Sequence, residues 1–328
     1  MLYDDHSAKL ARTGMVVRKN RGQYLVLGDG FRIPCAISSR LRKTLIYPTA
    51  SPTSLHHRVQ RVEDIEVVDP VAVGDWVSFL DAGDGTGIIH DVLPRKTQLS
   101  RRAAGDIPLE QVMVANVDQV VIVFAAAKPT PKWNLLDRYL VTAESAGLPA
   151  LICITKLDLT DPAELQAELD LYRHLGYPIL LTSAAQGQGI AEVRQALAGR
   201  VSILMGKSGV GKSSLLNAVQ DGLGLKVSAV GKGDTGKGRH TTTHLEMFSL
   251  DAGGAVVDTP GMREFTLWGM AEQDLAGLFP EMRPFIGRCQ FQSNCQHEQE
   301  PGCAIRRAVE TGNIATRRYA SYLKLLQE

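Results

Sequence analysis

The sequence contains no apolar stretch long enough to cross a lipid bilayer. Its longest apolar run, residues 120–127, is far shorter than the roughly 20 residues that a transmembrane helix needs. The first six residues include two aspartates and lack the apolar core of a secretory signal peptide, so we expect none. These absences predict a cytoplasmic protein that works without a membrane.

Cysteine is also scarce. The chain has five cysteines, an odd number, and three of them lie within the last forty residues. This distribution does not suit a disulfide framework and favours a reducing compartment. Cys35 and Cys153 lie within apolar segments, and we interpret them as core residues.

Net charge is almost absent, because 36 Lys and Arg are balanced by 35 Asp and Glu. The balance hides a basic N-terminal part, since residues 1–61 hold eleven Lys and Arg against three acidic residues. A local excess of this kind favours a polyanionic partner. A basic surface that meets only solvent is the alternative.

What the chain does contain is a glycine-rich phosphate loop. Residues 206–213 read GKSGVGKS and stand between a strand-like run at 201–205 and a helix-like segment at 214–219. Such a loop turns its backbone N–H groups toward a phosphate, while Lys212 supplies charge to the β- and γ-phosphates and Ser213 a magnesium ligand. The predicted nucleotide-binding residues here are Gly206, Lys207, Ser208, Gly209, Val210, Gly211, Lys212, Ser213 and Ser214.

A second motif selects guanine over adenine. Thr155, Lys156 and Asp158 follow the strand-like run at 151–154. The Asp158 carboxylate can accept hydrogen bonds from N1–H and the N2 amine of guanine, and adenine lacks this pair of donors. The Lys156 stem would pack over the purine, and Ser183 and Ala184 would support guanine O6 through backbone N–H groups. The motif by itself also fits a surface loop, but its place at a strand end favours a base site.

Two further elements complete a GTPase site. Asp258 and Gly261 lie in the sequence VVDTPG at 256–261, where the carboxylate reaches magnesium through water and the glycine N–H meets the γ-phosphate. A threonine hydroxyl before this strand would complete the magnesium shell. We favour Thr242 for this role, with Thr241 as the alternative, so magnesium is expected on Ser213 and Thr242.

The order of these motifs is unusual. In ordinary GTPases the phosphate loop precedes the base-reading motif, whereas here residues 155–158 and 182–184 come before 206–213 and 258–261. This order corresponds to a circular permutation that keeps the site and moves the chain termini. We therefore expect a central α/β circularly permuted P-loop GTPase domain over residues 99–272, with a parallel sheet covered on both faces.

One catalytic part is missing from this set. Met262 follows Gly261, where Ras-type proteins place a glutamine that orients the attacking water, and a thioether cannot do this. We expect the chain alone to hydrolyse GTP slowly. His240 is the candidate catalytic residue. The alternatives are a group supplied by a partner and a His240 that has no role.

Residues 1–98 are predicted to form an N-terminal β-barrel of the OB-fold type. Five short extended segments, expected to pair antiparallel, lie at 12–18, 23–27, 31–36, 75–80 and 87–92. A polar, basic insert at 40–61 is expected to form a mobile loop that contacts RNA. A basic linker is expected after the barrel, with Arg95, Lys96, Arg101 and Arg102.

The last part of the chain, residues 273–328, carries a metal-ligand pattern. The spacing C-x5-C-x-H-x5-C is formed by Cys289, Cys295, His297 and Cys303. Four such ligands leave no position open for water, so we expect a structural zinc that folds a small zinc-binding α domain. Buried free thiols are the alternative. Two helical stretches are predicted at 304–310 and 315–326, and their arginines make this end basic: Arg306, Arg307, Arg317 and Arg318.

The permuted motif order, the cysteine spacing and the barrel together resemble the ribosome small-subunit-dependent GTPase A family, which comprises circularly permuted bacterial ribosome-biogenesis GTPases. The resemblance covers essentially the whole chain and rests on residues 206–213, 258–261 and 289–303. It implies a monomeric cytoplasmic GTPase that binds the small ribosomal subunit and its rRNA during late maturation and meets assembly factors there. It also implies that the subunit stimulates hydrolysis, and that the barrel and the zinc domain are RNA-binding arms.

Two other classes remain open at this point. One is a GTP-dependent switch that acts on a protein partner or a membrane rather than on rRNA, although no lipidation signal supports a membrane. The other is an RNA-binding module whose nucleotide site is only structural. Lys212, Ser213 and Asp258 are all present, which counts against that second class.

Overall fold

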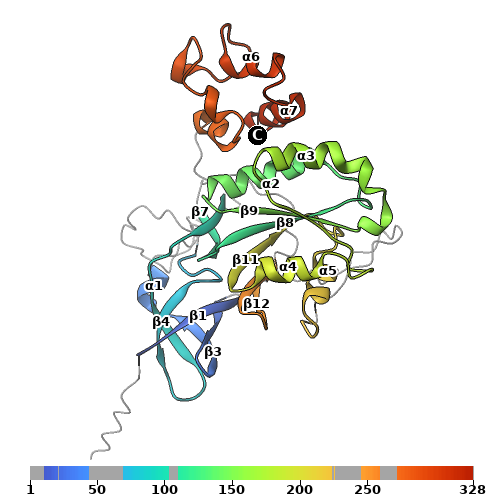
Figure 1. Cartoon of the computed structure of the whole chain (residues 1–328). Coiled ribbons are helices and arrows are strands. Elements are labelled where there is room, and N and C mark those ends of the chain that lie inside the picture. The colour runs from blue at the N-terminus through green and yellow to red at the C-terminus, as the bar shows by residue number, and fades with distance from the viewer. Residues whose placement is uncertain are drawn as a thin grey trace, which may run out of the picture.

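The computed structural model describes residues 11–20, 22–43, 69–102, 110–223, 225, 245–258 and 272–327. Within these ranges an N-terminal barrel is followed by a central sheet with helices and then by a C-terminal part made of short helices (Figure 1). None of the helices in these ranges combines the length and the apolar character needed to cross a membrane.

The barrel confirms the five predicted strands. They are β1 (Ala11–Asn20), β2 (Gln23–Gly28), β3 (Phe31–Ile37), β4 (Trp76–Asp81) and β5 (Gly87–Val92), and a short helix, α1 (Ser39–Lys43), follows β3. β1 pairs with both β2 and β4, which closes the barrel around buried residues such as Val16, Val26 and Phe79. Most of the insert expected at 40–61 lies outside the described residues, which exclude 44–68.

The expectation that all five strands pair antiparallel is wrong for one pair. β3 and β5 are parallel, with Cys35 opposite Gly87. The barrel closure dictates this direction. Because β4 is antiparallel to β1 and β5 is antiparallel to β4, β5 runs the same way as β1 and β3. Cys35 is buried in this barrel, as predicted for a core residue.

The central sheet has the predicted parallel strands. In spatial order they are β10 (Ile179–Leu181), β9 (Ala150–Thr155), β8 (Gln119–Ala125), β11 (Arg200–Met205) and β13 (Gly254–Asp258). Every residue of β8 is buried, which explains why this strand reads as a continuous apolar run. The strand before the phosphate loop, β11, lies between β8, which comes earlier in the chain, and β13, which comes later. This arrangement confirms the circular permutation.

Helices cover both faces of this sheet (Figure 1). They are α2 (Trp133–Ser145), α3 (Gln166–His174), α4 (Ile190–Leu197) and α5 (Lys212–Val219). Successive side chains of β8 pack on opposite faces of the sheet. Ile122 packs in the core that includes Leu140 of α2, and Val123 packs in the core that includes Leu216 of α5. Two 3-10 turns precede α3, namely η1 (Leu157–Leu159) and η2 (Pro162–Leu165).

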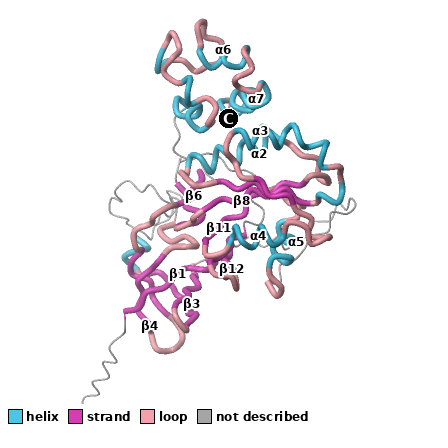
Figure 2. Tube along the Cα trace, viewed as in Figure 1, coloured by secondary structure: helices cyan, strands magenta, loops and turns pink. Residues whose placement is uncertain are grey.

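One strand that the sequence did not predict joins the barrel to the central sheet. β12 (Glu246–Ser249) pairs antiparallel with both β13 and β1, so the strands continue from one part into the other (Figure 2). Arg18 of β1 is the register partner of Glu246, and Glu246 is the register partner of Asp258. The barrel therefore lies one strand away from a predicted site residue.

The predicted linker at 95–102 is wrong in part, because its second half forms a hairpin. β6 (Gln98–Arg102) pairs antiparallel with β7 (Glu110–Ala115), and Leu99 lies opposite Val114. Both of these side chains are buried, and they lie 15 positions apart in the sequence. The basic residues between them hid the strand pattern.

The C-terminal part confirms the two predicted helices, α6 (Ala304–Glu310) and α7 (Thr316–Leu326). Three 3-10 turns precede them: η3 (Glu272–Leu278), η4 (Arg283–Phe285) and η5 (Gln292–Asn294). Its core contains Phe279, Met282 and Tyr322 together with Val141 of α2. The C-terminal part is therefore packed against the central domain through α2.

Candidate functional site

The phosphate loop lies between β11 and α5, at the carboxyl end of the central strands. Gly206 has φ +156°, and a Cβ atom there would lie 2.3 Å from Val123 O, so a larger residue would clash with the backbone of β8. Gly211 has φ +100° and stands immediately before α5. The loop can therefore hold its tight path only with glycine at its two turning points.

Lys212 lies across this loop. Its ammonium group donates hydrogen bonds to Gly206 O at 2.6 Å and to Lys207 O at 3.2 Å. Burial lowers the pKa of Lys212 below its usual value, and the Asp258 carboxylate opposes this shift. The cation is thus held inside the curve of the loop, where the phosphates of a nucleotide are expected.

The predicted base-reading residues contact the phosphate loop directly. Thr155 Oγ1 donates to Val210 O at 2.5 Å, and Lys156 Nζ donates to Gly209 O at 2.7 Å. Lys156 has φ +60°, a left-handed conformation that turns the chain sharply after β9. Burial lowers the pKa of Lys156, and the neighbouring Asp158 opposes this shift. The two predicted motifs, 155–158 and 206–213, therefore form one connected surface.

The ends of β9 and β10 bring the remaining base-site residues together. Ser183 Oγ donates to Asp158 Oδ1 at 2.5 Å, and Leu157 N donates to Thr182 O at 3.2 Å. Ser183 itself is buried and held by backbone hydrogen bonds with Gln188, while its neighbour Ala184 is half-buried. The Asp158 carboxylate is thus oriented by the loop that was predicted to support guanine O6.

Asp258 ends β13, next to the phosphate-loop strand. It is the register partner of Leu204 in β11, and its side chain is half-buried. This position is consistent with a carboxylate that faces magnesium beside the phosphates. The other predicted residues of this part, Thr241, Thr242, His240 and Gly261, lie outside the described residues, so their placement stays a prediction.

The four predicted metal ligands come together in the C-terminal part. Cys289, Cys295, His297 and Cys303 are all buried, and their ligand atoms lie within 4.8 Å of one another. His297 Nδ1 lies 3.4 Å from both Cys289 Sγ and Cys303 Sγ, and these two sulfur atoms are 3.8 Å apart. A tetrahedral ion with Zn–S bonds of about 2.3 Å places its sulfur ligands about 3.8 Å apart, so the spacing fits. This group can hold a metal ion.

Backbone groups around the cluster support it as a ligand set. Ala304 N donates to Cys289 Sγ at 3.3 Å and Arg306 N donates to Cys303 Sγ at 3.5 Å. Burial raises the pKa of the Cys295 thiol to about 12. Ionised sulfur ligands at this position therefore need a cation beside them, which a bound metal supplies.

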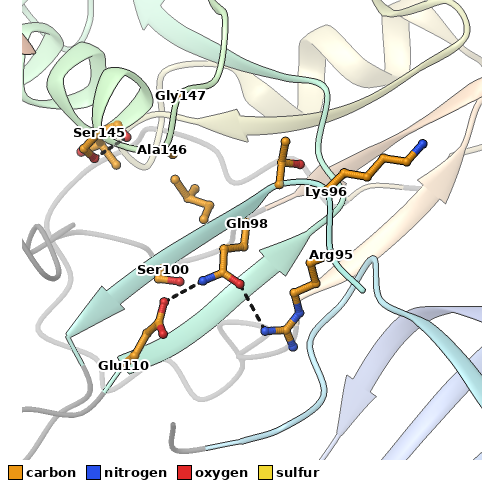
Figure 3. A pocket seen from close by; sticks show the side chains of 11 residues that line it. Arg95, Lys96, Gln98, Ser100, Glu110, Ser145, Ala146 and Gly147 are labelled. Carbon is orange, nitrogen blue, oxygen red and sulfur yellow. Dashed lines mark hydrogen bonds between the residues drawn. The ribbon is translucent and has the colours of Figure 1, made fainter. Parts of the chain in front are cut away.

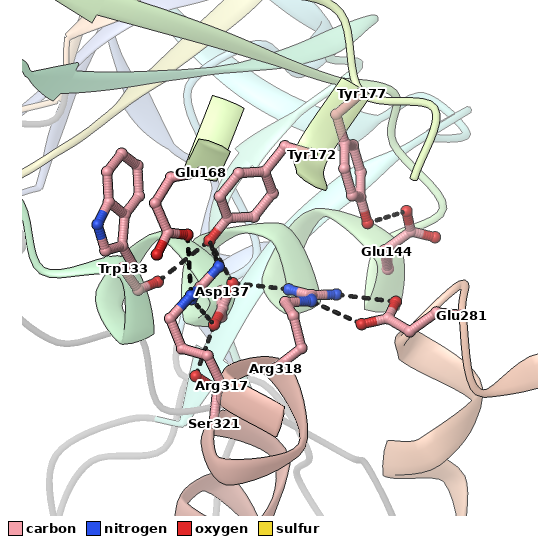
Figure 4. A network of polar contacts seen from close by, with 10 residues as sticks. All are labelled: Trp133, Asp137, Glu144, Glu168, Tyr172, Tyr177, Glu281, Arg317, Arg318 and Ser321. Carbon is pink, nitrogen blue, oxygen red and sulfur yellow. Dashed lines mark hydrogen bonds and ion pairs between the residues drawn. The ribbon is translucent and has the colours of Figure 1, made fainter. Parts of the chain in front are cut away.

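A buried polar junction between α2 and α7 was not predicted from the sequence (Figure 4). Asp137 of α2 accepts hydrogen bonds from Arg317 Nη1 at 2.9 Å and Arg318 Nη1 at 2.7 Å. Arg318 also contacts both carboxylate oxygens of Glu281, at 2.6 and 3.1 Å. The arginines that make this end of the sequence basic are therefore not all at the surface. Arg318 is fully buried, and Arg317 and Arg318 are both paired with acids.

A cavity of about 570 Å³ lies away from the phosphate loop, between β6 and the C-terminal end of α2 (Figure 3). Its polar side chains bind one another, because Gln98 donates to Glu110 at 2.9 Å and accepts from Arg95 at 3.3 Å. Arg95 also holds the buried Asp75 carboxylate, at 2.7 and 2.8 Å. We interpret these contacts as the support that joins the barrel to the hairpin.

Known proteins resemble this chain in both sequence and fold. The family model described as RsgA GTPase matches residues 92–268. The chain is 46% identical over 260 residues to the small ribosomal subunit biogenesis GTPase RsgA of Gemmatimonas aurantiaca, covering 79% of this chain and 84% of that relative.

Two solved structures resemble the whole chain. The crystal structure of YjeQ from Thermotoga maritima matches with a TM-score of 0.71 and 33% identity, covering 97% of this chain and 98% of that one. The crystal structure of YloQ, a circularly permuted GTPase, matches with a TM-score of 0.67 and 28% identity, covering 98% and 96%. The family match, the identity and the shared permuted fold together show that this chain belongs to the RsgA GTPase family and is a GTP hydrolase.

Proposed function

We propose that this GTPase binds the small ribosomal subunit, assists its late maturation, and hydrolyses GTP to GDP and phosphate faster when bound there. The observation that carries the proposal is the connected nucleotide surface, in which Ser183 holds Asp158 and Thr155 holds Val210 of the phosphate loop. Such a surface suits guanine nucleotides, and the RsgA relative is named for small-subunit biogenesis.

In this proposal the bound nucleotide contacts three groups of residues. The phosphates lie on the loop at 206–214, with Lys212 at the β- and γ-phosphates and magnesium on Ser213 and Thr242. Asp258 reaches the magnesium through water, and the Gly261 N–H meets the γ-phosphate. The base lies against Lys156 and is read by Asp158, with Ser183 and Ala184 at guanine O6. The positions of Lys156 and Asp158 beside Gly209 and Ser183 support this assignment.

The hydrolytic step is proposed to need the partner. Met262 cannot orient a water molecule, so the slow step is the placement of the nucleophile in line with the γ-phosphate. His240 is the proposed group in this chain, brought to the site when the subunit binds. The alternative is a catalytic group that the subunit itself inserts. Removal of the His240 imidazole would abolish the stimulation of hydrolysis in the first case and leave it unchanged in the second.

The Cys289, Cys295, His297 and Cys303 group is proposed to hold one structural zinc per chain. Four ligands of nitrogen and sulfur at the observed spacing favour zinc over magnesium or calcium, which prefer oxygen. The ion supplies charge that stabilises the thiolates and ties residues 289–303 into a fixed loop. No reaction step is assigned to it.

Exposed arginines are proposed to contact rRNA in place of the buried ones. Arg32, Arg40 and Arg307 are exposed, with 58% of the Arg32 side chain accessible, and Arg18 is half-buried with 41% of its side chain accessible. Contacts to phosphates from such residues would make binding salt-dependent. The chain is proposed to act as a cytoplasmic monomer and to meet other assembly factors on the subunit. A switch acting on a protein partner alone is not favoured.

Co-sedimentation with purified ribosomal subunits tests the proposal. The chain is mixed with small or large subunits in the presence of GDP or a non-hydrolysable GTP analogue, over a series of salt concentrations. We expect binding to the small subunit with the analogue, weaker binding with GDP, and a loss of binding as salt rises. Equal binding to both subunits, or none to the small subunit, would contradict the proposal.

A further inference from the structure

The junction between α2 and α7 has contacts that lead toward two predicted sites. One is the base-reading loop, residues 155–158, and the other is the metal-ligand group of Cys289, Cys295, His297 and Cys303. Asp137, at the centre of the junction, is fully buried and accepts four hydrogen bonds (Figure 4). Arg317 and Arg318 supply two of them, while the Tyr172 and Ser321 hydroxyls donate at 2.6 and 2.5 Å. One carboxylate of α2 thus binds residues of both α3 and α7.

Helix α7 connects the junction to the metal-ligand group. Tyr319 donates through its hydroxyl to His297 O at 2.6 Å, and Tyr322 donates to Gln296 O at 2.8 Å. These two tyrosines follow Arg318 on the same helix. Because α7 contacts Asp137 and the loop of a metal ligand, a change in the metal loop alters the contacts that hold α7 in place.

The segment that leads into α2 connects the junction to the predicted nucleotide site. Lys156 Nζ donates to Lys128 O at 2.5 Å, and Lys128 lies in the connection that leads to Trp133, the first residue of α2. The Trp133 ring packs between Phe124 and Tyr172, with ring centroids 5.6 and 6.0 Å away. Tyr172 in turn binds Asp137. Residue 156 of the base-reading loop therefore contacts the segment that leads into α2, the helix that the C-terminal part binds.

Charge at this interface is complementary. Arginines on the C-terminal side meet acids on the central domain, as Arg283 meets Glu144 at 2.6 Å and Arg317 meets Glu168 at 2.9 Å. A buried carboxylate that loses its arginines is costly, because nothing else compensates its charge. This cost disfavours arrangements in which the C-terminal part is partly docked and the carboxylate stays buried without its arginines. A two-state element, docked or separated, can carry coupling between sites.

We infer that Asp137 is a positioning residue that couples guanine-nucleotide binding to the metal-dependent docking of the C-terminal part. The inference rests on the proposed function for the identity of its two ligands, a guanine nucleotide and zinc. Coupling between two binding equilibria is reciprocal. In this inference docking favours the arrangement of the base-reading loop that binds nucleotide. Zinc then raises the affinity for nucleotide, and nucleotide raises the affinity for zinc by the same factor.

The test compares GDP affinity of the full chain with zinc bound and after removal of zinc by a chelator. For the natural protein we expect a difference on the order of 5-fold or more. Asp137→Asn removes the charge at nearly constant volume and should bring the ratio close to one. Asp170→Asn is the matched control, because Asp170 forms an exposed pair with Arg173 within α3 and should leave the ratio unchanged.

The reverse measurement is zinc affinity, determined by competition with a chromophoric chelator with and without saturating GDP. It should give the same factor for the natural protein and lose it in Asp137→Asn. If that variant does not fold, Arg317→Met takes its place, since Arg317 is 28% exposed and Arg318 would still bind Asp137. Arg317→Met should reduce the ratio.

Two results would overturn the inference while the proposed function stands. One is equal GDP affinity of the natural protein with and without zinc. The other is a full coupling factor in folded Asp137→Asn or Arg317→Met protein. Failure of the natural protein to prefer guanine nucleotides or to bind zinc would instead contradict the proposed function.

Discussion

The Ser183 hydroxyl donates a 2.5 Å hydrogen bond to the Asp158 carboxylate, although the two residues are 25 positions apart in the chain. The parallel pairing of β9 with β10 brings them together, because Ile154 and Leu181 are register partners just before each loop. The bond fixes one carboxylate oxygen and thereby the direction in which Asp158 faces a base. Guanine recognition in this account depends on that orientation.

Asp158→Asn is expected to weaken GTP binding and to favour xanthine nucleotides. The amide replaces one acceptor by a donor, which suits the carbonyl that xanthine carries in place of the guanine amine. Loss of a charged pair of hydrogen bonds predicts about 2–4 kcal/mol less binding free energy for GTP. Ser183→Ala, which keeps the carboxylate and loses only its orienting bond, should cost about 1 kcal/mol. Filter binding that shows unchanged GTP affinity in Asp158→Asn would place the base elsewhere.

The strands and the loop around the predicted nucleotide site were predictable because the signals of these motifs are local. The phosphate loop and the residues around Asp158 carry their chemistry in short runs, and their order predicted the permutation. The four metal ligands also fall within fifteen residues, and they are brought together as expected. Such motifs need no knowledge of distant partners.

Arg317 and Arg318 show what the sequence could not provide. Read locally, two arginines on a C-terminal helix predict a basic surface. Their partner Asp137 lies 180 positions earlier, so the burial of the pair follows only from the packing of α7 on α2. The same holds for β12, a four-residue strand whose role depends on its pairing with β1 of the barrel. Long-range partners decide both cases.

Arg318→Met is expected to destabilise the protein by about 3–5 kcal/mol, because it leaves the buried Glu281 carboxylate without its arginine and the buried Asp137 carboxylate with Arg317 alone. Urea denaturation followed by tryptophan fluorescence measures the change, and Trp133 lies beside this junction. Arg173→Met is the control, since its pair with Asp170 is exposed and within one helix. Equal denaturation midpoints for Arg318→Met and Arg173→Met would show that the junction contributes little.

Cys295→Ser is expected to lower bound zinc from one ion per chain to nearly none and to unfold residues 289–303. Binding should remain selective for guanine over adenine, because the base-reading residues lie in the central domain. Elemental analysis gives the metal content, and nucleotide competition gives the selectivity. A zinc-free natural protein, freshly purified without chelators, would rule out the structural metal.

His240→Ala is expected to leave GTP affinity and subunit binding unchanged and to remove the stimulation of hydrolysis. The reason is that only an imidazole delivered to the γ-phosphate replaces the orienting group that Met262 lacks. Single-turnover hydrolysis at saturating small subunit measures the effect, which we expect to be on the order of 10²-fold. Full stimulation of the variant would assign the catalytic group to the ribosome instead.

The most direct test of the account is the rate of GTP hydrolysis by the natural chain alone, with purified small subunits, and with purified large subunits. We predict slow hydrolysis by the chain alone, because Met262 follows Gly261 where a glutamine would orient the attacking water. Small subunits should raise the single-turnover rate on the order of 10²-fold, and large subunits should not. A rate that is equally fast without subunits, or that both subunits raise alike, would contradict it.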